Sequence, residues 1–168
     1  MSRPQTSLAA WHARLLLALG LALAFLVPVI SDRMVENARI RSWGGKGFSS
    51  EETRRWWNGG IARQAEAIRW RATGFGPEGA AAWRAMQFIA QDAKEWAEAG
   101  FDVPGAVEWR KYAFEPPAAA QWRDAGFGLG DAVAWRKHAF GPAEAARWKA
   151  VSYSPLEAAD RKRAGAAP

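Results

Sequence analysis

The sequence predicts an all-α protein in which an N-terminal transmembrane helix precedes an array of short helices stacked like a solenoid. The main observation is a row of nine tryptophans from Trp43 to Trp148, spaced by 13 or 14 residues. A large apolar residue follows each of them five positions later. A separate uncharged, mostly apolar run covers residues 15–30. Self-similarity at a short, fixed period is typical of helical repeat proteins.

We call the regular tryptophans and their apolar partners the Trp/Phe ladder. Its tryptophans are Trp43, Trp56, Trp70, Trp83, Trp96, Trp109, Trp122, Trp135 and Trp148. Most partner positions hold phenylalanine, namely Phe48, Phe75, Phe88, Phe101, Phe114, Phe127 and Phe140, and Ile61 and Tyr153 hold the other two. A buried aromatic side chain removes roughly 150–250 Å² from water. We therefore expect the ladder to form the core of a repeat domain over residues 48–160.

Residues 1–31 form the predicted membrane anchor. The run from Leu15 to Ile30 would rise about 24 Å as a helix, which is short against a hydrocarbon core of roughly 30 Å. Residues 13–31 reach a workable span across the lipid bilayer when the Arg14 side chain extends toward the headgroups. The alternative is a signal peptide with a weak cleavage site at Ser31, which would release a secreted protein.

The orientation of this segment is weakly set, because basic residues occur on both sides of it. Signal-anchors usually insert with the amino terminus inside. We therefore expect a single-pass protein of the bacterial inner membrane with its repeats outside the cytoplasm. Residues 32–47 predict a juxtamembrane helix, which Gly44 and Gly45 should end in a turn.

Proline and small polar residues predict where the repeat helices start. Proline is tolerated in the first turn of a helix, and here it falls two or three residues after a ladder aromatic. These prolines are Pro77, Pro104, Pro116, Pro142 and Pro155. Ser49, Asp102 and Ser154 are expected N-caps, because their side chains can accept a hydrogen bond from a free backbone N–H.

Glycine directly before the ladder aromatic predicts where the helices end. The positions are Gly47, Gly60, Gly74, Gly100 and Gly126. Glycine there suits the left-handed C′ residue of a closing turn, in which Trp is C3 and contacts the aromatic at C″. Each helix should then run for nine or ten residues. Its fourth residue, usually Ala, should share the buried face with the Trp three residues later.

A second period of 26 residues overlies the first. The C′ position reads Gly100, Ala113, Gly126 and Ala139 in successive units. A left-handed conformation is unfavourable for Ala, so alternate turns are expected to differ in geometry. The predicted unit is therefore a helical hairpin of two 13-residue halves. Residues 161–168 form a predicted basic, flexible tail.

Charge and composition exclude several functions. Between residues 46 and 157 there are fifteen basic and fourteen acidic residues, so the repeats lack the basic footprint of a nucleic-acid-binding protein. The chain has no Cys, and it carries no nucleophile, phosphate-loop or paired-histidine motif. We expect no catalytic residue, no cofactor and no metal site, and hence no enzyme.

The sequence therefore predicts a membrane-anchored helical-repeat scaffold or protein-interaction module that serves as an accessory subunit of a larger membrane assembly. Its expected partners are membrane-associated proteins. The candidate interaction face is the basic residue that follows several ladder tryptophans: Arg84, Arg110, Arg123, Arg136 and Lys149. The alternative is a module that binds glycan or cell-wall polymer through exposed tryptophans.

Overall fold

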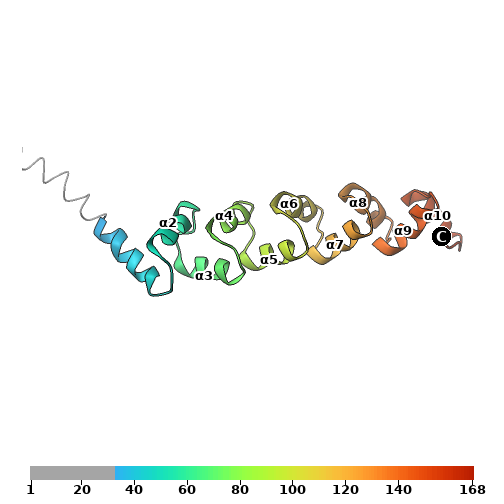
Figure 1. Ribbon diagram of the computed structural model, residues 1–168. Coiled ribbons are helices and arrows are strands. Elements are labelled where there is room, and N and C mark those ends of the chain that lie inside the picture. The colour runs from blue at the N-terminus through green and yellow to red at the C-terminus, as the bar shows by residue number, and fades with distance from the viewer. Residues whose placement is uncertain (1–32) are drawn as a thin grey trace, which may run out of the picture. The chain divides into compact units, whose positions relative to one another are not determined.

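The computed structural model describes residues 33–168, which are helical throughout with short connecting turns (Figure 1). The described chain divides into two compact units between Asn58 and Gly59. The first contains a helix over residues 33–44 and the helix α2, and the second contains α3 to α10. No strand occurs among the described residues, so the predicted all-helical repeat architecture is confirmed for this part of the chain.

The labelled helices are equal in length, nine residues each. Their bounds are α2 Ser50–Asn58, α3 Gln64–Ala72, α4 Pro77–Ala85, α5 Ala90–Glu98, α6 Val103–Lys111, α7 Pro116–Asp124, α8 Leu129–Lys137, α9 Pro142–Ala150 and α10 Pro155–Arg163. Isolated helices of this length are marginal in water. Their stability must therefore come from packing against neighbouring helices.

The helix starts agree with the sequence prediction. Proline is the first residue of α4, α7, α9 and α10 and the second of α6. The Asp102 carboxylate accepts a hydrogen bond from the Gly105 N–H at 2.8 Å, and the Ser49 hydroxyl caps α2 in the same way. Ser154 and Glu157 form a reciprocal capping box. The Ser154 side chain and backbone N–H lower the pKa of the exposed Glu157 carboxyl.

The helix ends form the predicted closing turn. In α6 the Phe114 N–H donates to the Trp109 carbonyl at 3.3 Å, and the Ala113 N–H donates to the Arg110 carbonyl at 2.9 Å. The same pair of bonds recurs after Trp43 and after each ladder Trp from residue 70 to residue 148. These are the two hydrogen bonds of a Schellman motif, with Trp at C3 and the aromatic at C″.

The expected difference between alternate turns is wrong. Ala113 and Ala139 adopt φ of 55° and 61°, in the left-handed region that Gly100 and Gly126 occupy at 81°. The physical reason is that both hydrogen bonds of the motif require a left-handed C′ residue whatever its side chain is. The turns therefore share one geometry, and the alanines carry a conformational cost of roughly 1–2 kcal/mol each.

The ladder forms the core of both units. The nine ladder tryptophans are 0–7% exposed, and the fourth residue of every helix from α3 to α10 is a fully buried Ala. Each Trp contacts its aromatic partner across the closing turn, edge to face, with ring centroids 4.9–5.7 Å apart. The small Ala beside the large indole lets neighbouring helices approach closely.

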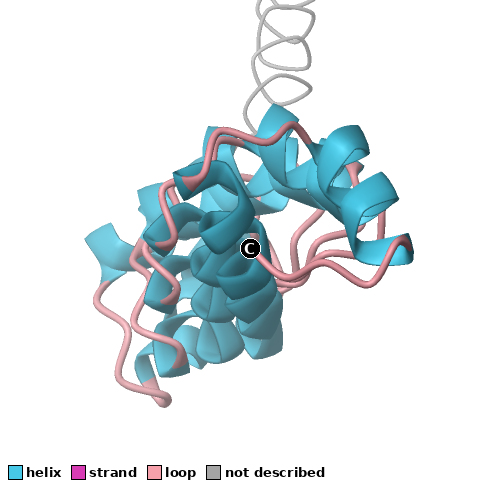
Figure 2. Ribbon diagram, turned by 90° about the vertical axis from the view of Figure 1, so that its right-hand side faces the viewer, coloured by secondary structure: helices cyan, strands magenta, loops and turns pink. Residues whose placement is uncertain are grey.

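Alternate helices of the second unit lie in two rows (Figure 1). We call α4, α6, α8 and α10 the even row, and α3, α5, α7 and α9 the odd row. Viewed from the side that carries α10, the helices gather in stacks joined by loops (Figure 2). Each helix therefore has sequence neighbours in the other row and a spatial neighbour two helices away in its own row. This arrangement has the 26-residue repeat that the sequence suggests.

No helix within residues 33–168 is both long and apolar enough to cross a membrane. The predicted anchor at residues 1–31 lies outside the described residues. The predicted juxtamembrane segment corresponds to the helix over residues 33–44, which ends in a turn at residues 45–47.

Replacement of one ladder indole tests whether the array unfolds as a unit. Trp109→Ala should lower the free energy of unfolding by about 3–5 kcal/mol, because it leaves a cavity beside two phenylalanine rings. Urea unfolding followed by circular dichroism measures this loss. Leu156→Ala, at a position 57% exposed, is the control and should change stability by less than about 0.5 kcal/mol. Gradual unfolding with unchanged helicity would contradict the shared core.

The left-handed turns offer a reciprocal pair of substitutions. Ala113→Gly should raise the free energy of unfolding by up to about 1 kcal/mol, because glycine relieves the positive φ. Gly126→Ala should lower it by a similar amount. An added Cβ at Gly126 would meet no atom within 4 Å, so the loss would report backbone strain alone. Effects of the same sign in both variants would exclude this explanation.

Candidate interaction surface

The five basic residues of the predicted interaction face all lie one position after a ladder Trp, in the last turn of their helices. They are exposed at the surface. Arg84, Arg110 and Arg136 lie on the even row, and Arg123 and Lys149 lie on the odd row. The structure therefore divides this set between the two rows, and each side chain makes a specific contact within the array.

Three of the four arginines contact the closing turn of the preceding helix in their own row. Arg110 donates to the Met86 carbonyl at 2.7 Å, and its guanidinium lies 3.7 Å from the centre of the Phe88 ring. Arg136 donates to the carbonyls of Tyr112 and Ala113 and lies over Phe114. Arg123 does the same on the odd row, at Ala99, Gly100 and Phe101. Each of these three arginines thus joins helix n to helix n+2.

The lysines reach a carboxylate on the preceding helix and a ring at the closing turn two helices earlier. Lys149 lies 3.2 Å from the Asp131 carboxylate, eighteen residues earlier, and 4.7 Å from the Phe127 ring centre. Lys162 repeats this with Glu144 and Phe140. A guanidinium presents several donors in a planar fork and can bond two carbonyls at once, whereas an ammonium is a compact charge. Arg84 pairs with the Glu66 carboxylate of the preceding helix, as the lysines do with theirs. We call the residue after the ladder Trp the clip position, and Lys162 occupies it in α10, where Arg161 stands in place of the Trp.

The position after the clip differs between the rows. On the even row it holds Lys111, Lys137 and Arg163, in α6, α8 and α10. On the odd row the corresponding residues of α5 and α7 are Glu98 and Asp124. All five side chains are exposed. From α5 to α8 the even row is therefore basic where the odd row is acidic, and in α3, α4 and α9 the same position holds Ala.

The next position, the C-cap, holds a residue with a ring after two helices of the even row. Tyr112 follows α6 and is 48% exposed, and His138 follows α8 and is partly buried. A cavity of about 440 Å³ lies beside the latter, between the end of α8 and the last turn of α10. Lys137, His138, Lys162 and Arg163 line it together with two alanines. Its charged lining is entirely basic.

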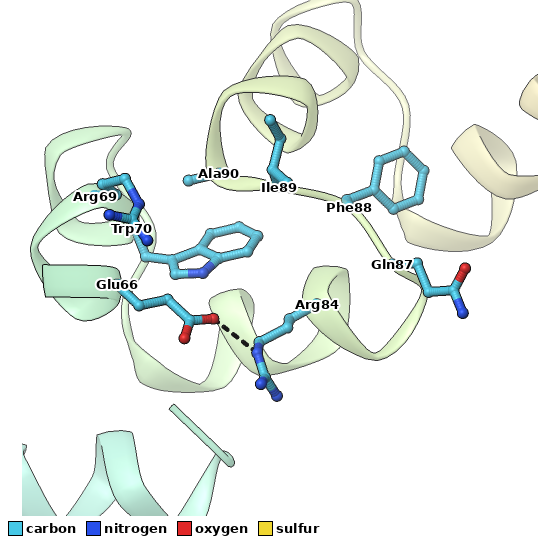
Figure 3. Close-up of a pocket in the computed structure, with 8 residues that line it drawn as sticks. All are labelled: Glu66, Arg69, Trp70, Arg84, Gln87, Phe88, Ile89 and Ala90. Atoms are coloured by element: carbon cyan, nitrogen blue, oxygen red, sulfur yellow. Dashed lines mark hydrogen bonds and ion pairs between the residues drawn. The ribbon is translucent and has the colours of Figure 1, made fainter. Parts of the chain in front are cut away.

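A second cavity, of about 450 Å³, lies among α3, α4 and the turn into α5 (Figure 3). The Trp70 indole lies between an ion pair on one side and Ile89 and Ala90 on the other. The pair joins Glu66 to Arg84 at 2.7 Å. The acid and the cation of this pair neutralise each other, and Arg69 is the other charged residue in the lining.

No group of three or more His, Cys, Asp or Glu residues within residues 33–168 is placed to hold a metal ion. His138 is the one histidine in that part of the chain, and its neighbours at the cavity are cationic. We found no protein family, curated protein or solved structure that matches the chain. The surface chemistry is therefore the guide to function.

Sequence reasoning identified the clip position as the candidate face but missed the contrast between the rows at the position after it. The signal was present in the recurrence of Trp-Arg-Lys at residues 109–111 and 135–137. This signal could be interpreted only once the structure showed that consecutive helices lie in different rows. The clip contacts themselves join residues 18 to 24 positions apart, which depends on the stacking of the helices.

Neighbouring cations in α8 test the different roles of the two positions. Arg136→Ala should lower the free energy of unfolding by about 1–2 kcal/mol, since it removes charged hydrogen bonds and a cation–π contact that are partly screened by solvent. Lys137→Ala should change it by less than about 0.5 kcal/mol, because Lys137 makes no ion pair with the described residues. Chemical unfolding measures both. Equal losses of unfolding free energy in the two variants would mean that the two positions contribute equally to stability.

Proposed function

We propose that the chain is a membrane-tethered helical-repeat scaffold that binds a protein partner, as an accessory subunit of a larger membrane assembly. The observation that carries the proposal is the burial of the ladder tryptophans, 0–7% exposed, beneath a surface of regularly spaced charged residues. The large side chains of the array are buried in its own core. Recognition is left to the exposed positions of the helices.

The long-range contacts support a preformed surface. Ladder contacts join consecutive helices, and the clip arginines Arg110, Arg123 and Arg136 join helices of the same row. A surface that both the ladder contacts and the clip contacts hold in place loses little conformational freedom on binding. This rigidity favours recognition of a folded or extended protein partner. Stacked helical repeats generally use such extended surfaces for binding.

The same burial disfavours the alternative function. A glycan-binding module needs an aromatic face that is open to a sugar ring, and the nine ladder indoles have none to offer. The two cavities described above each have charged residues in their lining. We therefore prefer a protein partner to a cell-wall polymer.

The membrane tether of the proposal rests on the apolar run over residues 15–30. An anchor over residues 13–31 in the bacterial inner membrane would hold the repeats close to the bilayer, where a partner that is itself in the membrane is concentrated. We propose that the repeats lie outside the cytoplasm. A chain released by cleavage of its signal peptide is the competing arrangement.

Cross-linking from single cysteines tests the proposed function, because the natural chain has no Cys. A benzophenone maleimide is attached to Tyr112→Cys on the even row or to Ala150→Cys on the odd row, in the full chain. Illumination in native membranes should yield a discrete protein adduct from at least one exposed site. The natural chain, which has no Cys to take the label, is treated in the same way and is the control for non-specific adducts.

The chemistry of the adduct decides between the proposals. A discrete protein adduct that disappears when excess unlabelled chain competes supports the scaffold. Adducts to carbohydrate alone would favour the glycan-binding module. Absence of any competed adduct from both rows would overturn the scaffold proposal.

A further inference from the structure

We propose that the C-terminal ends of the even-row helices form a docking ridge for an acidic segment of the protein partner. The ridge consists of Lys111 and Tyr112 after α6, Lys137 and His138 after α8, and Arg163 at the end of α10. This proposal rests on the proposed scaffold function and deepens it, because it names the face and the chemistry of the partner.

The contrast between the rows is the first argument. Basic residues in the last turn of a helix are favourable on their own, because they complement the negative end of the helix dipole. That explanation applies equally to both rows. The odd row nevertheless carries Glu98 and Asp124 in α5 and α7, at the positions where α6 and α8 carry lysine. The helix dipole therefore does not account for the ridge.

The availability of these charges is the second argument. The clip residues beside them are engaged with carbonyls, carboxylates and rings of the array. Lys137, in contrast, makes no ion pair with the described residues. Lys111 and Arg163 pair only with Glu108 and Asp160, three residues earlier in their own helices. Both pairs are more than half exposed, and exposed pairs of this kind are weak and readily exchanged.

The ridge also offers contact area. The Tyr112 ring is 48% exposed, and tyrosine beside a basic residue is common at the centre of protein interfaces. The cavity of about 440 Å³ between α8 and α10 is lined by Lys137, His138, Lys162 and Arg163. A carboxylate side chain of a partner could enter it and meet donors from two helices.

The local pattern of charge favours a protein over a polyphosphate. Glu108 and Asp160 lie next to the cations in the same helices, and they would repel the closely spaced phosphates of a nucleic acid. Nucleic-acid-binding proteins usually present an uninterrupted basic surface, which residues 46–157 lack. A peptide with spaced carboxylates can place each one on a cation and avoid the acids.

Fluorescence anisotropy on the full chain in phosphatidylcholine nanodiscs tests the ridge. The probe is a fluorescein-labelled peptide of alternating glutamate and glycine, and its glutamine counterpart is the uncharged control. The test variant combines Lys111→Glu, Lys137→Glu and Arg163→Glu. The matched control combines Arg69→Glu, Lys94→Glu and Arg147→Glu on the odd row, which changes the net charge equally.

The glutamate peptide should bind the natural chain in a salt-dependent manner. The ridge variant should weaken this binding by roughly tenfold or more, and the odd-row variant by much less, because charge reversal at a contact acts locally. If the ridge variant loses helicity, the neutral variant with Lys111→Gln, Lys137→Gln and Arg163→Gln replaces it, with a smaller expected loss. Equal weakening by both rows, or no binding of the glutamate peptide, overturns the proposal.

Two further probes separate the partner classes. Comparable ridge-dependent binding of a single-stranded oligothymidylate, or of phosphatidylserine vesicles, would overturn the assignment to a protein partner. Cross-linking separates this proposal from the scaffold function. The ridge proposal is overturned, and the scaffold proposal stands, if Ala150→Cys gives a protein adduct that unlabelled chain competes away and the ridge substitutions leave that adduct unchanged. The scaffold proposal is overturned if, without the ridge substitutions, neither labelled position gives such an adduct.

Discussion

The turn that closes each helix is the constraint on which the rest of the structure depends. The Trp carbonyl at C3 accepts a hydrogen bond from the aromatic residue at C″, and the two rings meet edge to face across the same turn. One short motif therefore ends a helix, begins the approach to the next and buries the largest side chains of the unit. A nine-residue helix has little stability alone, so this repeated local contact is what makes such short helices usable.

The closing turns connect only consecutive helices, and contacts from the clip position also connect helices that are not consecutive, so that the helices stack. Ladder contacts such as Phe101 to Trp109 run between consecutive helices, whereas Arg110 and Arg136 reach the turn two helices earlier. The clip arginine lies directly after the Trp, so the same helical end supplies both the core and the long-range contact. Stability in such arrays is approximately the sum of each repeat and its neighbouring interfaces. A change in one unit is therefore felt first by the helices on either side.

Much of this fold could be predicted from the sequence because its determinants are local. Proline at helix starts, the caps at Asp102 and Ser154, and the Trp at C3 are all decided within a few residues, and the structure has them as expected. The turn at Ala113 was predicted wrongly, because intrinsic preference was weighed without the two hydrogen bonds that impose its positive φ. The clip contacts were not predicted, since only stacking brings Arg136 to the Tyr112 carbonyl.

The two periods of the sequence have different physical causes. The core explains the 13-residue period, because successive units have the same closing turn and bury a Trp and an Ala at equivalent positions. The alternation of glycine and alanine at C′ leaves that turn unchanged. Packing of the core therefore gives no reason for a 26-residue period at the exposed positions. Lys111 and Lys137 occupy them in α6 and α8, and Glu98 and Asp124, which pair within their own helices, occupy them in α5 and α7. The docking ridge that we propose for the even row would account for this difference.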